Sequence, residues 1–139
     1  MRRKRAAFPT HCGVRLEGVR TILVKVLNWL IALCGLWQFG DIAAFFVPGF
    51  GTVPVSIWNH VIVGFILMFL GSTAALTSNV GTAKKLDWIA AIAGAWLMIA
   101  RLILGIPEMN AGLCNDLIVG LIVFILGIWA ALSTPRAVC

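Results

Sequence analysis

Four ionisable side chains lie within or at the ends of the long apolar stretches of this 139-residue chain: Asp41, His60, Arg101 and Asp116. A lone charge in hydrocarbon costs at least about 2.5–3.5 kcal/mol, so such residues usually pair with one another or mark an ion path. The helices predicted below place all four at similar depth, beneath the outer surface of a membrane. We therefore expect one candidate polar cluster.

Two interpretations of this cluster stay open. In the first it is an ion or proton site, because intramembrane ionisable groups are functional candidates and histidine changes charge near neutral pH. In the second, Asp41 and Arg101 form a structural ion pair and the arginine reaches outward to the interface. The neighbouring Asn59, Asn115 and Asp116 then cap the starts of helices.

Sequence motifs for other chemistry are absent. The four cysteines, at positions 12, 34, 114 and 139, form no Cys-x-x-Cys pair and no zinc-binding cluster with histidine. Haem ligation by two histidines needs both in the membrane, whereas His11 precedes the first apolar stretch. No phosphate-binding loop, metalloprotease helix or Ser-His-Asp candidate is visible. We expect no catalytic residue, no metal site and no cofactor.

The composition indicates a membrane protein. Hydrophobic residues make up 61% of the chain, charged residues make up 12%, and the mean hydropathy is +1.02. Soluble proteins average roughly 45–50% and 25%, because a soluble domain needs polar surface to cover its core. This composition excludes a cytosolic enzyme, a free nucleic-acid-binding protein and a disordered protein.

Four apolar stretches are long enough to cross about 30 Å of hydrocarbon. Lipid cannot satisfy free backbone N–H and C=O groups, so these stretches must be helices. The predicted spans are residues 22–46, 57–77, 86–106 and 117–133. We therefore predict an all-α membrane protein with an up-down-up-down bundle of four transmembrane helices. The bundle, residues 22–133, lies between a basic arm (1–21) and a short tail (134–139).

Basic residues gather on one side of the predicted spans. Seven of the eleven lysines and arginines precede residue 26, and Lys84, Lys85 and Arg136 lie at the same end. The opposite connectors contain only the acidic Glu108 and Asp116. Because cytoplasmic loops are enriched in lysine and arginine, we predict a multi-pass protein of the inner (plasma) membrane with both termini cytoplasmic. The expected partner of the basic arm is anionic lipid, not nucleic acid.

Six tryptophans fit this layout. Four lie near the ends of the predicted spans, where indole rings favour the headgroup level: Trp29, Trp58, Trp88 and Trp129. Trp37 and Trp96 lie deeper, and we interpret them as bulky packing between helices.

The two halves of the chain are copies of one another. A shift of 59 aligns the first span with the third, matching Trp29 to Trp88, Gly35 to Gly94 and Trp37 to Trp96. A shift of 56 aligns the second span with the fourth, matching Asn59 to Asn115, Gly64 to Gly120 and Gly71 to Gly127. The first repeat covers about residues 22–77 and the second about 86–133. Since each copy has two spans, the predicted pseudo-two-fold axis runs along the membrane normal.

The repeated residues resemble the SPW-repeat family of small bacterial and archaeal membrane proteins. Each family repeat has a Gly-x-Trp segment in its first helix, then a Trp-Asn or similar pair and a glycine in its second. Here the pattern reads Gly35-Leu36-Trp37, Trp58-Asn59 and Gly64, then Gly94-Ala95-Trp96, Cys114-Asn115 and Gly120. Asp41-Ile42-Ala43 and Ala100-Arg101-Leu102 replace the Ser-Pro-Trp tripeptide. The resemblance covers roughly residues 26–133 and implies an integral membrane protein without an established activity.

Glycine spacing indicates how the helices pack. Gly64 and Gly71 are seven residues apart, as are Gly120 and Gly127, so each pair lies on one helix face. Small residues let helix backbones approach closely inside a membrane. We favour packing within the chain over a homodimer seam, and expect bulky replacements at Gly64 or Gly120 to loosen the bundle.

Three functional hypotheses remain. The first is a non-catalytic membrane module, either structural or binding a partner such as a larger membrane protein or a second copy. The second is a small transporter or channel that uses the outer polar cluster. It would need several protomers, because side chains fill the core of four helices. The third and weakest is a membrane enzyme that uses His60 with Asp41 or Asp116.

Overall fold

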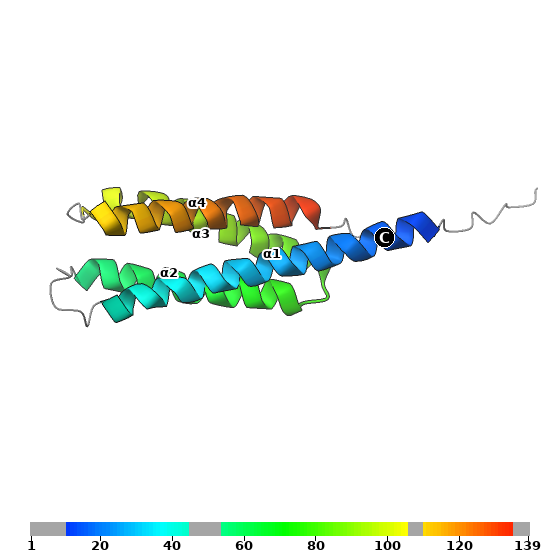
Figure 1. The fold of residues 1–139 in the computed structure, drawn as a ribbon, viewed down its shortest axis with the longest axis horizontal. Coiled ribbons are helices and arrows are strands. Elements are labelled where there is room, and N and C mark those ends of the chain that lie inside the picture. Colours follow the sequence, from blue (N-terminus) through cyan, green and yellow to red (C-terminus); the bar gives the residue numbers. More distant parts are fainter. Residues whose placement is uncertain (1–10, 45–53, 106–109, 135–139) are drawn as a thin grey trace, which may run out of the picture.

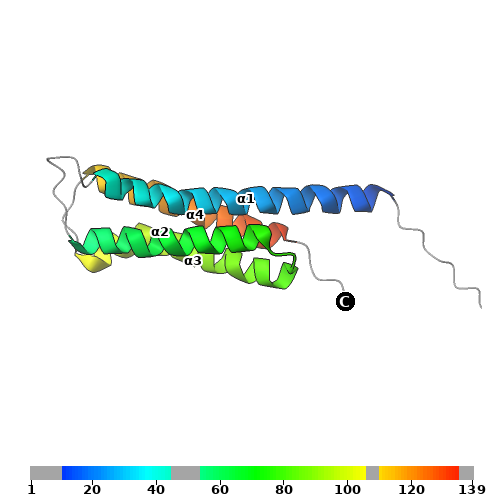
Figure 2. The same ribbon diagram turned by 90° about the horizontal axis from the view of Figure 1, so that it is seen from below.

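The computed structural model describes residues 11–44, 54–105 and 110–134. Within these residues the chain is helical, without strands: α1 (His11–Ala44), α2 (Pro54–Leu76), α3 (Val80–Leu104) and α4 (Asn110–Ser133). The helices alternate in direction along one long axis (Figures 1 and 2). We call the end where α1 and α3 finish and α2 and α4 begin the distal end. The opposite end, past which the first turns of α1 project, is the proximal end.

The helices are longer than the predicted spans. α1 begins at His11 instead of residue 22, and α4 begins at Asn110 instead of residue 117. The predicted connector 78–85 is mostly helical, because α3 begins at Val80 and includes Lys84 and Lys85. The physical reason is that a helix satisfies its own backbone and can continue beyond the hydrocarbon layer.

Local signals mark several helix ends. α2 begins at Pro54, a residue whose missing N–H costs nothing in a first turn. The side chain of Asn79 accepts a 3.1 Å hydrogen bond from the backbone N–H of Thr82 and thereby caps α3. α3 is followed by Gly105, whose φ of 61° is the left-handed conformation that ends many helices.

Among the described residues, three helices contain stretches that are long and apolar enough to cross a membrane: Gly18–Phe39, Trp58–Leu76 and Leu113–Ser133. They belong to α1, α2 and α4. In the described part of α3, Lys84, Lys85 and Asp87 occupy the early turns and lower its apolar character. The exposed surface carries large apolar side chains along all four helices. This is the surface of a helical membrane protein.

The helices pack in two pairs, α1 on α2 and α3 on α4, and the seams α2–α3 and α1–α4 join the pairs. The close contacts of the first pair recur in the second. A Cβ atom on Gly35 would lie 2.5 Å from the backbone nitrogen of Met68, and one on Gly94 would lie 2.6 Å from that of Phe124. Since position 68 shifted by 56 is position 124, the two repeats pack alike residue by residue.

A second matched contact lies nearer the proximal end. A Cβ atom on Gly71 would lie 2.6 Å from the backbone nitrogen of Ala32, and one on Gly127 would lie 2.8 Å from that of Ala91. These glycines therefore lie in the seam within each repeat. Their missing side chains let the helix backbones touch.

The core has an apolar middle and a buried polar layer at each end. Eight apolar residues form the middle: Ile31, Val63, Leu67, Leu70, Ala90, Leu97, Val119 and Val123. The proximal polar layer contains Asn28, Asp87 and Thr134, and the distal polar layer contains Gln38, His60 and Asp116. These two layers hold the buried polar side chains that could carry chemistry.

Candidate functional site

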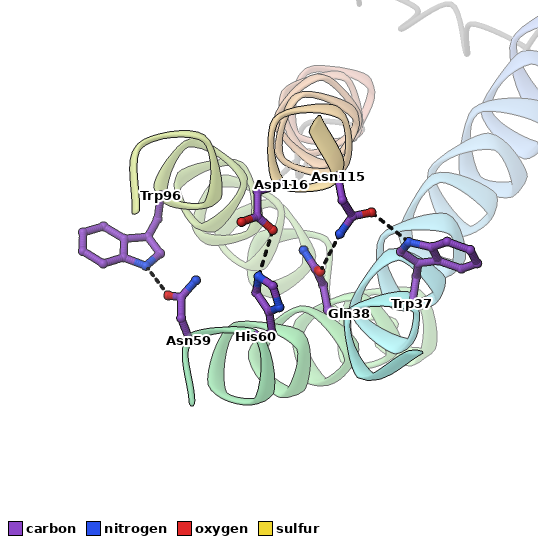
Figure 3. Close-up of polar contacts among 7 residues, drawn as sticks. All are labelled: Trp37, Gln38, Asn59, His60, Trp96, Asn115 and Asp116. Carbon is purple, nitrogen blue, oxygen red and sulfur yellow. Dashed lines mark hydrogen bonds and ion pairs between the residues drawn. The ribbon is translucent and has the colours of Figure 1, made fainter. Parts of the chain in front are cut away.

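The distal polar layer is centred on an ion pair between α2 and α4. Nε2 of His60 lies 2.9 Å from Oδ1 of Asp116, and the two residues are 7% and 2% exposed. Figure 3 shows the imidazole and the carboxylate pointing at one another between the helices. The pair is charged when the histidine is protonated. Two of the four residues of the predicted polar cluster are thus in direct contact.

The side chains of the other two members, Asp41 and Arg101, lie outside the described part of the structure. Both residues belong to the distal turns of their helices, α1 and α3. Their pairing with each other, and with His60 and Asp116, stays a prediction.

The prediction that residues beside this pair cap helix starts is wrong. α2 begins at Pro54 and α4 at Asn110, so Asn59 and Asn115 lie more than one turn inside their helices. Their side chains consequently point across to neighbouring helices and bind there.

Two matched hydrogen bonds flank the ion pair. The indole Nε1 of Trp37 donates to Oδ1 of Asn115 over 3.1 Å. The indole Nε1 of Trp96 donates to Oδ1 of Asn59 over the same 3.1 Å distance. Each tryptophan therefore binds the asparagine of the other repeat (Figure 3). This crossed pair of bonds closes the α1–α4 and α2–α3 seams at the distal end.

The interpretation of Trp37 and Trp96 as packing between helices is wrong. Trp37 is 63% exposed and Trp96 is 38% exposed. Both rings are partly exposed, and each indole N–H points toward an asparagine of the neighbouring helix (Figure 3). An amphipathic ring with an apolar body and one polar atom suits this position at a lipid-facing seam.

Gln38 is a member of the distal layer that is not among the predicted site residues. It is fully buried, and its Oε1 accepts a hydrogen bond of 3.4 Å from Nδ2 of Asn115. Its Nε2 has no hydrogen-bond partner among the described residues. The repeat alignment contains a signal for it, since position 38 shifted by 59 is Leu97, an apolar residue in the middle of the third predicted span.

The proximal layer was also missed as a site. Asp87 is 1% exposed, and Oγ1 of Thr134 lies 3.3 Å from its Oδ2 and 2.7 Å from the backbone oxygen of Ala130. Asn28 is fully buried and lies beside the Asp87 carboxylate. Nδ2 and Oδ1 of Asn28 and Oδ1 of Asp87 make no hydrogen bond of good geometry with the described residues. The signal was again the repeat, because a shift of 59 aligns Asn28 with Asp87.

A groove beside the distal layer is a further feature of the described residues. Among the described residues, no group of three or more His, Cys, Asp or Glu side chains could hold a metal ion. An open groove of about 560 Å³ runs between α1 and α4. Its lining is almost entirely apolar, with the Trp37–Asn115 pair at its distal end and the free thiol of Cys34 on its wall. Such a groove suits hydrocarbon, not a charged substrate.

Comparisons with known proteins agree with the repeat. The SPW repeat domain family matches residues 25–130, which is most of the chain. No curated protein and no solved structure matches the chain. The matched residues include both Gly-x-Trp segments, both asparagines of the crossed bonds and the His60–Asp116 pair. The chain is therefore a membrane protein that belongs to the SPW repeat family.

Proposed function

We propose that this protein is a non-catalytic module of the plasma membrane, built as a bundle of four transmembrane helices with both termini in the cytoplasm. The fourth span is α3, which lies between α2 and α4 and is apolar from Ile89 to Ala100. The proximal end faces the cytoplasm, because Arg20, Lys25, Lys84 and Lys85 lie there. Asp87 follows these lysines and enters the membrane as a buried residue of the core.

One observation carries this proposal: the polar side chains of the distal layer bind one another. His60 is paired with Asp116, and both asparagines accept indole hydrogen bonds from the opposite repeat. A catalytic or transport site needs polar groups that face a cavity. Here these groups hold the repeats together, which supports a structural or partner-binding role in which the apolar outer surface contacts lipid or another membrane protein.

The arrangement of the core favours this role over transport through one chain. Asn28 and Gln38 are ten residues apart on α1, so about 15 Å separates the two polar layers. The space between them is filled by apolar side chains, including Leu67, Leu97 and Val123, which are fully buried. A water path would require a gap between several copies of the chain.

Flux measurements test the proposal. The protein would be purified in mild detergent, its oligomeric state measured by light scattering, and proteoliposomes assayed for passage of H⁺, Na⁺ and K⁺. We expect no flux above that of empty vesicles, with a pore-forming peptide as positive control. Flux that is lost in His60→Ala or Asp116→Ala, in vesicles containing equal amounts of folded protein, would contradict the proposal and support the transporter hypothesis.

A further inference from the structure

Two polar contacts join positions that are equivalent in the two repeats. His60 shifted by 56 is Asp116, and these residues form the 2.9 Å ion pair. Asn28 shifted by 59 is Asp87, and these two lie side by side. A two-fold operation exchanges equivalent positions, so two equivalent residues that touch must lie on opposite sides of the axis itself.

The helix arrangement agrees with this placement. The neighbouring helices around the bundle are α1–α2, α2–α3, α3–α4 and α1–α4. The two pairs instead join diagonal helices, α2 with α4 at the distal end and α1 with α3 at the proximal end. The pseudo-two-fold axis therefore passes through a polar pair at each end of the core.

On a true two-fold axis each residue meets its own copy. Two first repeats would bring His60 against His60, and two second repeats would bring Asp116 against Asp116. Two carboxylates in one buried site repel each other, and so do two protonated imidazoles. A pair of two first repeats would therefore place histidine against histidine, whereas the intact chain places His60 against Asp116.

The flanking hydrogen bonds cannot distinguish these pairings. Trp37 and Trp96 are the same residue type at equivalent positions, as are Asn59 and Asn115. The crossed bonds would form equally well between two like repeats. Discrimination between like and unlike partners must come from equivalent positions that differ, and the distal pair places complementary charge there.

We propose that His60 and Asp116 are specificity-determining residues that make each repeat select the unlike repeat as its partner. The surface concerned is the inter-repeat face of α2 and α4 at the distal end, and the partner it fits is the other half of this chain. Buried like-charge contacts disfavour the wrong pairing while the ion pair stabilises the right one. This inference is independent of the proposed function.

An exchange of the two residues in the full-length chain tests the proposal. His60→Asp makes the pair Asp with Asp, Asp116→His makes it His with His, and the double exchange H60D/D116H restores one of each. The melting temperature in detergent and the monodisperse yield would be measured for all three variants. We expect each single variant to melt roughly 5 °C or more below the parent, and the double exchange to return to within about 2 °C of it.

A matched control uses equivalent positions away from the axis. Phe65 and Leu121 are related by the same shift of 56 and are exposed, at 56% and 49%. F65L, L121F and their double exchange should all melt close to the parent. The proposal is overturned if the H60D/D116H exchange is as unstable as the single variants, or if the single variants melt like the parent. If the single variants do not accumulate, recovery of the double exchange supports the proposal and its failure overturns it.

Discussion

The indole nitrogen of Trp37 lies 3.1 Å from the side-chain oxygen of Asn115, so α1 is hydrogen-bonded to α4. The equivalent bond joins Trp96 to Asn59. The partners of the two bonds differ, because Asn115 also donates to the buried Gln38.

This difference predicts unequal effects of two equivalent substitutions. Asn115→Ala removes the partner of both Trp37 and Gln38, and an unsatisfied buried amide costs about 1–3 kcal/mol. Asn59→Ala removes the partner of the exposed Trp96 and should cost about 0.5–1.5 kcal/mol. Unfolding in detergent would measure both free energies. Equal losses would show that Gln38 gains nothing from Asn115.

The glycine seams predict a position-dependent effect of a single methyl group. A Cβ atom on Gly71 would lie 2.6 Å from backbone atoms of Asn28 and Ala32, so Gly71→Ala must push α1 and α2 apart. We expect a loss of about 1–3 kcal/mol in the free energy of unfolding, as for other overpacked cores.

Gly18→Ala is the matched control for this seam. A Cβ atom at Gly18 would meet nothing within 4 Å. Alanine favours a helix by about 0.8–1.0 kcal/mol over glycine, so this variant should be at least as stable as the parent. Equal free energies of unfolding for the two variants would argue that α1 and α2 are not in backbone contact at Gly71.

The proximal layer predicts that the charge of Asp87 matters less than its hydrogen-bonding atoms. Asp87→Asn keeps an acceptor for Thr134 and adds a donor beside Asn28, so its stability should stay close to that of the parent. Asp87→Ala leaves the buried Thr134 and Asn28 without this partner, so the free energy of unfolding should fall by about 1–3 kcal/mol. Thermal unfolding of the two variants in the same detergent gives the comparison. A larger loss in Asp87→Asn than in Asp87→Ala would contradict this role.

The proposed topology predicts which connectors an impermeant reagent reaches. In a background with the native cysteines replaced by serine, Asn110→Cys should react with a membrane-impermeant maleimide on intact cells, because it lies at the distal start of α4. Ser78→Cys, in the exposed turn between α2 and α3, should react only after the cells are permeabilised. The reverse labelling pattern would show that the topology is the opposite of the proposed one.

The helical class and the approximate places of the helices in the described residues could be predicted from the sequence, because hydropathy is a local property. The ends of the helices could not be placed as well. Residues such as Lys84 and Asn110 are polar, so hydropathy predicts connectors at these positions, yet they extend α3 and α4. Hydropathy reports where lipid begins, whereas helix ends depend on capping residues such as Asn79 and Gly105.

The sequence by itself determined that this chain is an apolar, helical, duplicated membrane protein of the SPW repeat family. Those properties follow from composition and from residues that recur at fixed shifts, and both are properties of the linear sequence. Only the tertiary structure decided that His60 meets Asp116, that the tryptophan bonds cross between repeats, and that Gln38, Asn28 and Asp87 are buried. The physical reason is that such contacts depend on how far each helix is rotated about its own axis. That rotation is set jointly by the close glycine seams within each repeat and the polar pairs between them.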